Sequence, residues 1–212
     1  MIVENFGDNP FSPGVVQPVT VASVTRAAVE LKQEFPEIHF GINVLRNDAE
    51  SALSIAHVVG AEFIRVNVHV GAVVADQGII KGKAYETLRL KKSLNSEVAI
   101  IADIDVKHSA QIGNYDIMVQ AADALERGLA DAIVISGSRT GQAVDMKQLR
   151  ELRRIFPGAK IVIGSGANSR NVRELFKYAD CVIVGTSVKT EGKTSNPIDP
   201  KRLREFMKAA RA

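Results

Sequence analysis

Residues 160–186 read KIVIGSGANSRNVRELFKYADCVIVGT, and this stretch contains the pattern that repeats along the whole chain. An apolar run rich in Ile and Val ends in Gly and Ser, a helical pattern follows, and a second apolar run ends in Gly and Thr. Short, nearly continuous apolar runs that alternate with helices are typical of parallel strands covered on both faces. The stretch therefore predicts an α/β fold built from strand–helix units.

The same alternation extends over all 212 residues. The expected strands are 2–5, 39–44, 63–68, 98–104, 132–137, 160–165 and 181–186, and the expected helices lie near 19–34, 48–59, 84–94, 116–127, 145–155, 169–178 and 200–210. Helix boundaries are predicted by cap residues at Asn47-Asp48, Asp145, Asn168-Ser169 and Asp199-Pro200, and by Gly60 and Gly128, where only Gly adopts a left-handed conformation cheaply.

Two architectures fit this alternation: a doubly wound open sheet and a (β/α)8 barrel. Functional groups of an open sheet concentrate at one switch point, whereas every strand of a barrel ends at one shared mouth. Here nearly every expected strand ends in polar or Gly residues, namely Glu4-Asn5, Asn43, Asn67, Asp103, Ser136-Gly137, Gly164-Ser165 and Gly185-Thr186. The pattern favours the barrel.

The number of units is one short of the eight that a barrel needs. We find seven strand–helix units, and the last expected helix, 200–210, is near the end of the chain. Residues 1–212 are thus expected to form a single (β/α) barrel domain that lacks its first βα unit. An uncapped edge strand is an aggregation hazard, so we expect a homo-oligomer.

Composition narrows the possible partners and compartment. Hydrophobic residues make up 46% and charged residues 24%, which is ordinary for a globular protein, and no apolar run is long enough to span a bilayer. The single Cys181 forms no internal disulfide, so we expect a cytoplasmic location. The net charge of +3 and the 5% of aromatic residues without Trp argue against nucleic-acid binding.

The last two units predict a phosphate site. In barrels the loops after strands seven and eight often bind phosphate, because glycines let backbone N–H groups approach the anion. The alternative is that these glycines only permit tight turns. The candidate phosphate-binding residues are Gly164, Ser165, Gly166, Gly185, Thr186 and Ser187.

Residues 100–113, IIADIDVKHSAQIG, bring several ionisable side chains to one strand end. The strand's alternation points Asp103 and Asp105 into the barrel, with Lys107 and His108 at its rim. This set could serve as general acid and base, or could hold a divalent cation such as Mg²⁺, and Lys107 could form a Schiff base. The alternative is a set of ion pairs that neutralise inward charges. The sequence assigns no set of metal ligands, and Mg²⁺ is the one cofactor that it suggests.

The strand 63–68 follows the same logic. Arg65 and Asn67 are predicted to face inward, with Asp103 as the partner of Arg65. The long loop 71–82 after this strand is expected to be a lid, a substrate contact or a packed structural loop. The other candidates at the mouth are Glu4 as a catalytic residue and Asn5, Asn43, Arg46, Asp76 and Thr140, with Arg65 and Asn67, as substrate-binding residues.

The sequence argues against two other kinds of site, a dinucleotide-binding site and a zinc site. No Gly-x-Gly-x-x-Gly with a downstream acid is present. The four histidines, at 39, 57, 69 and 108, lack the spacing of a zinc site, and His57 on a helix is expected to be structural.

The blocks VENFGDNPF (3–11), GINVLRNDA (41–49), FIRVNV (63–68), GAVVADQGII (71–80), DIDVKHS (103–109), ISGSRTG (135–141), VIGSGAN (162–168) and VIVGTSVK (182–189) occur in order. Together they resemble the BtpA/SgcQ family over nearly the whole chain. The resemblance implies a (β/α)8 barrel of the ribulose-phosphate-binding type, with a further N-terminal segment in most members. The family's name comes from photosystem I biogenesis at thylakoid membranes, so peripheral membrane association follows only by family analogy. No catalytic residue is carried over from the family.

Two functions are compatible with the sequence. The first is an enzyme of the aldolase, isomerase or epimerase type that acts on a phosphorylated small molecule. The second is a non-enzymatic assembly or stabilisation factor that uses the barrel as a scaffold. Barrels host many functions, so the fold does not separate the two.

Overall fold

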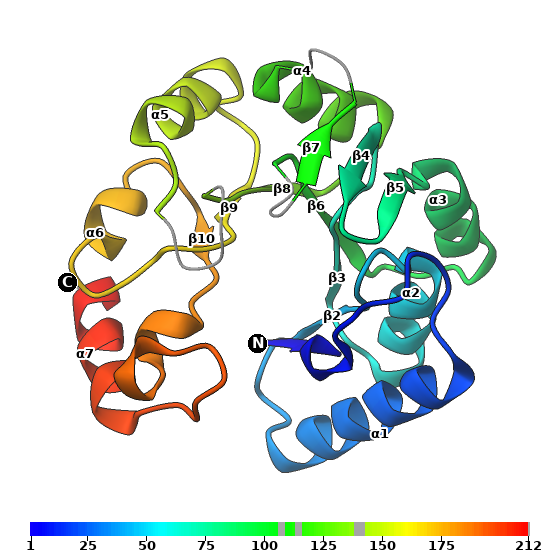
Figure 1. Cartoon of the computed structure of the whole chain (residues 1–212), viewed down its shortest axis with the longest axis horizontal. Coiled ribbons are helices and arrows are strands. Elements are labelled where there is room, and N and C mark those ends of the chain that lie inside the picture. Colours follow the sequence, from blue (N-terminus) through cyan, green and yellow to red (C-terminus); the bar gives the residue numbers. More distant parts are fainter. Residues whose placement is uncertain (106–108, 113–115, 138–142, 212) are drawn as a thin grey trace. The chain divides into compact units, whose positions relative to one another are not determined.

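The computed structural model describes residues 1–105, 109–112, 116–137 and 143–211 (Figure 1). The chain divides into two compact units. Unit 1 comprises Met1–Asp103 with Ser109–Asp131, and unit 2 comprises Ile104–His108 with Ala132–Ala212.

Unit 1 is built on a parallel sheet in the order β1-β2-β3-β6. The strands are β1 (Ile2–Glu4), β2 (Gly41–Asn43), β3 (Phe63–Val66) and β6 (Ala99–Asp103). The register aligns Glu4 with Asn43, Ile42 with Ile64 and Val66 with Ala102. Alternate residues of these strands, Ile42, Ile64, Val66 and Ile100, are buried in an apolar cluster with residues of the helices. The opposite parity is therefore left for polar side chains, as the sequence predicts.

Helices follow the strands of unit 1 in sequence. They are α1 (Pro18–Glu34), α2 (Ala49–Val59), α3 (Ala84–Ser93) and α4 (Ile117–Ala122), which continues as a π-helical turn, Asp123–Arg127. Asp48 caps α2 by accepting a hydrogen bond from the Ser51 N–H at 3.1 Å. The helix ends at Gly60, whose φ of 70° is left-handed. Both boundaries confirm the sequence prediction.

A small antiparallel sheet occupies the segment that the sequence presents as a long loop. Its order is β5-β4-β7, formed by β4 (Ala72–Ala75), β5 (Gly78–Lys81) and β7 (Ser109–Gln111). Val73 pairs with Ile80 and both are buried, whereas Val74 pairs with Ile79 and both are exposed. The expectation of a loop over 71–82 is thus wrong, because the apolar alternation on both sides of Asp76-Gln77-Gly78 forms a hairpin.

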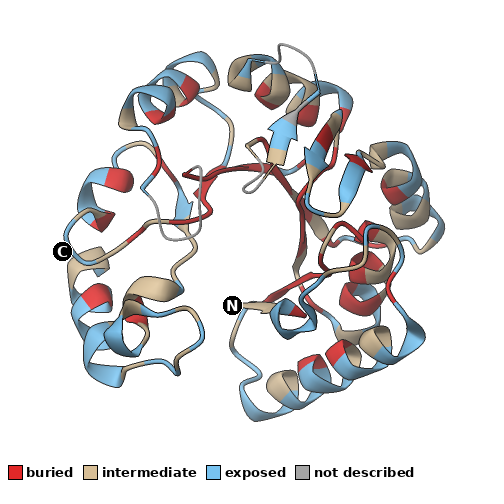
Figure 2. Ribbon diagram, in the orientation of Figure 1, coloured by how far each residue is buried: buried red, intermediate tan, exposed pale blue. Residues whose placement is uncertain are grey.

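Unit 2 continues the strand–helix alternation. Its parallel strands pair in the order β8-β9-β10 and are β8 (Ala132–Ile135), β9 (Ile161–Ile163) and β10 (Cys181–Val182). The helices are α5 (Met146–Ile155), α6 (Val172–Leu175) and α7 (Pro200–Arg211), with short 3₁₀ helices at Thr186–Val188 and Thr190–Gly192. Figure 2 shows that buried residues lie on the strands and on one side of each longer helix. Asp145 and Asp199 cap α5 and α7 as predicted.

Three acidic residues tie strand starts to their neighbours, and we call Glu62, Asp131 and Asp180 the carboxylate staples. Each directly precedes a strand and donates its N–H to the carbonyl of a neighbouring segment, at Phe40 (3.0 Å), Ile100 (2.8 Å) and Ile161 (2.8 Å). Each carboxylate accepts the N–H of that same residue, at 2.8, 2.8 and 2.7 Å. A basic residue pairs with each staple: Lys32, Lys91 and Arg153.

Some predicted boundaries are wrong. Gly128 ends the π-helical turn with φ −80°, and the left-handed residue is Leu129, with φ 51°. Asn168-Ser169 does not cap a helix, because the Asn168 Oδ1 accepts the Arg170 N–H in a local turn and α6 begins at Val172. The strands also end earlier than predicted, since several of their last expected residues enter loops.

Candidate functional site

A row of polar side chains follows the carboxyl ends of the strands of unit 1. Glu4 ends β1 and lies opposite Asn43 of β2, whose Nδ2 donates to the Glu4 Oε2 at 3.1 Å. Arg65 lies on β3, Asn67 follows the end of that strand, and Asp103 ends β6. The inward parity predicted for Asn43, Arg65, Asn67 and Asp103 is thus consistent with the contacts they make.

Arg65 and Asp103 form a buried bidentate pair. The Arg65 Nε and Nη2 each donate to one carboxylate oxygen of Asp103 at 2.9 Å. Their side chains are 9% and 2% exposed. Burial lowers the pKa of the Arg65 guanidinium, but the charge and hydrogen bonds of Asp103 raise it by more, with a contribution from Glu4, so that the net shift is upward. Arg65 is therefore a permanent cation, and the predicted pairing with Asp103 is confirmed.

Asn67 extends this pair and leaves one acceptor unused. Its Nδ2 donates to the Asp103 Oδ2 at 3.0 Å, and the residue is 4% exposed. Within the described residues the buried Asn67 Oδ1 has no hydrogen-bond partner. A buried acceptor without a donor costs free energy, so this atom is suited to a donor from a ligand or from water.

Arg46 and Asp76 lie in the same electrostatic environment. Arg46 follows β2 and is half-buried; burial lowers its pKa more than the charges of Asp103 and Asp76 raise it, and Arg65 lowers it further. Asp76 lies in the turn of the β4–β5 hairpin. The predicted substrate-binding residues Arg65 and Asp76 therefore both act on the pKa of Arg46.

The amide side chains of Asn5 and Asn47 hold loops together. The Asn5 Oδ1 accepts the Leu45 N–H at 2.7 Å and its Nδ2 contacts the Leu45 carbonyl at 3.3 Å. Asn47 does the same for Val68, at 2.8 Å and 2.9 Å. These polar groups fix the backbone after β1, β2 and β3. Asn5, predicted as a substrate contact, thus has a positioning role that the sequence did not indicate.

His69 is a buried polar residue that follows β3. It is 1% exposed, and its Nε2 lies 2.8 Å from the Gly128 carbonyl. Burial lowers the pKa of the imidazole, and the contact with Gly128 offsets this only in part. Its Nδ1 has no partner among the residues that the structure describes. The ring is therefore neutral and joins the segment after β3 to the end of the π-helical turn.

The two glycine-containing loops of unit 2 lie against each other. The Ser187 hydroxyl donates to the Ala167 carbonyl at 2.7 Å, which joins the loop after β10 to the loop after β9. Gly166 has a left-handed φ of 76°, and its carbonyl accepts from Asn168 and Asn171. Ser165 accepts the Gly137 N–H at 3.3 Å, and Thr186 contacts Thr194 at 3.1 Å. Among the described residues, the backbone N–H groups of Gly166, Thr186 and Ser187 have no acceptor.

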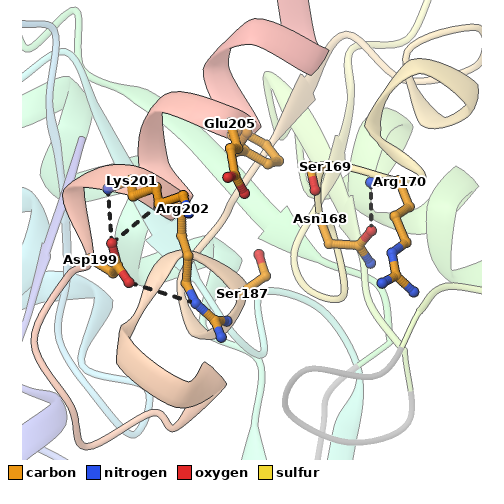
Figure 3. Close-up of a pocket in the computed structure, with 9 residues that line it drawn as sticks. Asn168, Ser169, Arg170, Ser187, Asp199, Lys201, Arg202 and Glu205 are labelled. Carbon is orange, nitrogen blue, oxygen red and sulfur yellow. Dashed lines mark hydrogen bonds and ion pairs between the residues drawn. The ribbon is translucent and has the colours of Figure 1, made fainter.

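A pocket of about 550 Å³ lies beside these loops (Figure 3). It is lined by Asn168, Ser169, Arg170, Ser187, Asp199, Lys201, Arg202, Glu205 and Phe206, all of unit 2. Of these, only Ser187 is among the predicted site residues. The others escaped prediction because their significance depends on the loop after β9 meeting the first turns of α7.

Several predicted residues cannot be placed. Lys107, His108 and Thr140 lie outside the described residues, and of the catalytic set only Asp103, Asp105 and Glu4 are described. In the described ranges, no three His, Cys, Asp or Glu side chains cluster as metal ligands. Mg²⁺ often uses only one or two carboxylates together with substrate phosphates. In the same part of the chain, no helix is both long enough and apolar enough to cross a bilayer.

Comparison with solved structures identifies the class of protein. An N-(5'-phosphoribosyl)anthranilate isomerase from Pyrococcus furiosus matches with a TM-score of 0.63 at 17% identity, over 99% of this chain and 86% of that one. KGPDC from Streptococcus mutans, solved as a complex, matches with a TM-score of 0.60 at 13% identity, over 93% and 84%. These likenesses show that the protein has a (β/α)-barrel fold.

Comparison of sequences then gives the family. The chain belongs to the BtpA family, whose sequence profile matches residues 1–212. An uncharacterised protein of Methanocaldococcus jannaschii, MJ1115, is 45% identical over 99% of this chain and 78% of its own length. The photosystem I biogenesis protein BtpA of Synechocystis is 44% identical over 99% of this chain and 72% of its own length. The predicted family and fold are confirmed.

Proposed function

We propose that this protein is an enzyme that acts on a phosphorylated small molecule, in a reaction of the aldolase, isomerase or epimerase type. The observation that carries the proposal is the pair of joined loops in unit 2. The hydrogen bond from Ser187 to the Ala167 carbonyl brings together two turns that leave the N–H groups of Gly166, Thr186 and Ser187 without acceptors among the described residues. Converging backbone N–H groups form an anion-binding site.

The phosphate site in this proposal comprises Gly164, Ser165, Gly166, Gly185, Thr186 and Ser187. The left-handed Gly166 allows the chain to turn sharply, and a side chain there would be strained. Barrels commonly bind phosphate with the loops after their last two strands and a short extra helix. The 3₁₀ helix Thr186–Val188 corresponds to such a helix. Solved structures of the same fold include isomerases of a phosphoribosyl compound, which supports this class of ligand.

The polar row of unit 1 is a second set of candidate site residues in this proposal. The Asp103 carboxylate is held by three hydrogen bonds from Arg65 and Asn67, so its proposed role is to keep Arg65 charged and Asn67 oriented. Proton transfer is then proposed for Glu4, Asp105, Lys107 and His108. Asn43, Arg46, Asp76 and the Asn67 Oδ1 are proposed to orient substrate hydroxyl groups, with Thr140 as a further contact. Mg²⁺ would bind as a complex with the substrate phosphate.

A thermal-shift screen of phosphorylated sugars and free phosphate, with and without Mg²⁺, tests this function. A ligand at ~100 times its dissociation constant adds about 2.7 kcal/mol of stability, which raises the melting temperature measurably. We expect at least one selective ligand and expect Gly166→Asp, which places a carboxylate in the anion site, to abolish its effect. A panel without any stabilising ligand contradicts the proposal.

An assembly or stabilisation factor is the second candidate. It is favoured by the outer face of the β4-β5-β7 sheet, where Val74 and Ile79 are 45% and 60% exposed side by side. Apolar groups that adjoin on an exposed face are typical of interaction surfaces. The Synechocystis relative carries the name of a photosystem I biogenesis protein. This function predicts silence across the ligand panel and loss of activity in complex assembly when Val74 and Ile79 are replaced by Lys.

A further inference from the structure

The pocket beside the loops of unit 2 is lined by five charged residues, Arg170, Asp199, Lys201, Arg202 and Glu205, and by one buried aromatic residue. Its walls are the turn at Asn168–Arg170, the Ser187 side chain and the first two turns of α7, and Phe206, which is 4% exposed, forms an apolar part of the lining. In Figure 3 the Arg202 side chain extends from α7 toward Ser187, and the Glu205 side chain lies between α7 and the Asn168–Ser169 turn. The pocket is therefore open to a molecule that offers both an anion and hydrogen-bond donors.

Most charged side chains of the pocket make few or no hydrogen bonds or ion pairs with the described residues. Asp199 uses one carboxylate oxygen to cap α7, accepting the N–H groups of Lys201 at 2.8 Å and Arg202 at 3.3 Å, and the other lies 3.8 Å from the Arg202 Nε. The exposed Arg170, Lys201 and Glu205 side chains have no hydrogen bond or ion pair within the described ranges. Three cations thus face two carboxylates, one of which is occupied as a cap.

We propose that this pocket binds a small polyhydroxylated molecule with one oxyanion group. The guanidinium of Arg202 binds the oxyanion, since its planar donors match a carboxylate or a phosphate in a two-point contact, and Lys201 and Arg170 add charge. The Glu205 carboxylate and the Ser169 and Ser187 side chains pair with hydroxyl groups. A volume of about 550 Å³ is in the range of small-molecule sites.

This site is separate from the proposed phosphate loops, although Ser187 belongs to both. The loops offer backbone N–H groups around Gly166, Thr186 and Ser187, whereas the pocket offers side chains of α7. Its occupation does not depend on the phosphate loops or on the proposed enzymatic activity. The oxyanion could be a phosphate ester or a carboxylate, and both sources share the same contact with Arg202.

The test is a titration of the ¹⁵N-labelled full chain at low salt, followed by amide shifts. The probes are glucose 6-phosphate for the phosphate ester and gluconate for the carboxylate. We expect the amides of Ser169, Arg170, Lys201 and Arg202 to shift in a saturable way with at least one probe. The probe that saturates identifies the oxyanion, and no saturable shift of these amides with either probe overturns the proposal.

Variants separate the pocket from its surroundings. Arg202→Ala is expected to weaken binding at least tenfold, and Glu205→Gln is expected to weaken it through the hydroxyl contacts. Arg204→Ala removes an exposed cation of the same helix that does not line the pocket, and is expected to stay within twofold of the wild type. Gly166→Asp disables the proposed phosphate loops and is expected to leave the shifts of Lys201 and Arg202 unchanged. Equal weakening by Arg202→Ala and Arg204→Ala would mean a general charge effect and would overturn the proposal, and the spectra themselves report whether each variant is folded.

Discussion

Asp103 is the residue that holds the polar row of unit 1 in place. It receives hydrogen bonds from Arg65 Nε, Arg65 Nη2 and Asn67 Nδ2, at 2.9, 2.9 and 3.0 Å. The strand's alternation was enough to predict the Arg65–Asp103 pair, because a charged residue on the inner parity needs a nearby opposite charge. The roles of Asn5 and Asn47 could not be predicted, since they depend on the path of loops that sequence periodicity does not describe.

Replacing Asp103 by Asn is expected to destabilise the protein by about 3–5 kcal/mol, because it leaves the Arg65 charge buried without its partner. Urea unfolding measures the loss. The double variant Arg65→Met with Asp103→Leu removes both charges, and we expect it to be more stable than Asp103→Asn alone. A loss below about 0.5 kcal/mol for Asp103→Asn, which is ordinary for a surface change, would contradict the burial of this pair.

His69 gives the protein a pH dependence of known sign. Its pKa in the folded state lies below the ordinary value of about 6.5, chiefly because the ring is buried. As the pH falls below about 6.5, the unfolded chain binds more protons at His69 than the folded chain does. The contribution of His69 to stability is therefore complete above about pH 6.5 and declines below it. We expect His69→Gln to reduce the fall in the urea midpoint between pH 7.5 and 5.5. His57→Gln, at an exposed histidine, serves as the control, and an unchanged slope in His69→Gln would refute the assignment.

At the scale of elements, the carboxylate staples secure the starts of β3, β8 and β10. Each of them lies in a short segment, Ala61-Glu62, Ala130-Asp131 or Ala179-Asp180, in which a buried Ala precedes the acid. This repeat is visible in the sequence, but its meaning is not, because the acid's partner belongs to a strand or segment about 20 to 30 residues earlier in the chain. The same reason explains why residues 71–82 were expected to form a loop. The third strand of the sheet that contains the β4–β5 hairpin is β7, which lies about 35 residues further on.

Asp131→Ala and Asp180→Ala are each expected to cost about 1–3 kcal/mol, because each leaves a strand N–H without its acceptor. The matched control is Glu30→Ala, which removes an exposed ion pair with Arg26 on α1 and is expected to cost only a few tenths of a kcal/mol. Unfolding in urea compares the three variants. Equal losses in all three would show that the staples contribute no more than surface charges do.

Two of the staples, Glu62 and Asp180, contribute to the response of the protein to acid. Partial burial raises the pKa of Glu62 and of Asp180, but hydrogen bonds from the Phe40 and Ile161 N–H groups, together with neighbouring basic side chains, lower each pKa by more. The folded-state pKa is thus depressed, and the stability from these groups is present above the ordinary value of about 4 and is lost as the pH falls through the folded-state value. Asp180→Asn is expected to flatten the loss of melting temperature between pH 5 and 3, relative to the wild type. An unaltered acid profile would contradict this reading.

At the scale of the whole molecule, the alternation of strands and helices and the polar strand ends were enough to predict the barrel class, and the order of the sequence blocks was enough to predict the family. The glycines of the last two loops predicted a phosphate site, which stays a prediction. The sequence did not reveal the pocket lined by Arg202 and Glu205, because these residues look like an ordinary solvated helix face until α7 meets the turn after β9.

Ligand binding should therefore stabilise the molecule as a whole. We expect a phosphorylated ligand to raise the melting temperature of the wild type and of Arg204→Ala equally, because Arg204 lies outside both proposed sites. The same ligand should have no effect on Gly166→Asp if its phosphate binds only to the loops. If the ligand stabilises the Gly166→Asp variant as much as the wild type, the loops do not bind its phosphate.

The most direct measurement of the central claim is a titration of the ¹⁵N-labelled protein with inorganic phosphate, observed at the amides of Gly166, Thr186 and Ser187. We predict that these three amides shift together in a saturable way, because their N–H groups have no acceptor among the described residues and belong to two loops that the Ser187–Ala167 hydrogen bond joins. Saturable shifts that are confined to other parts of the chain, or no shifts at all, would contradict it.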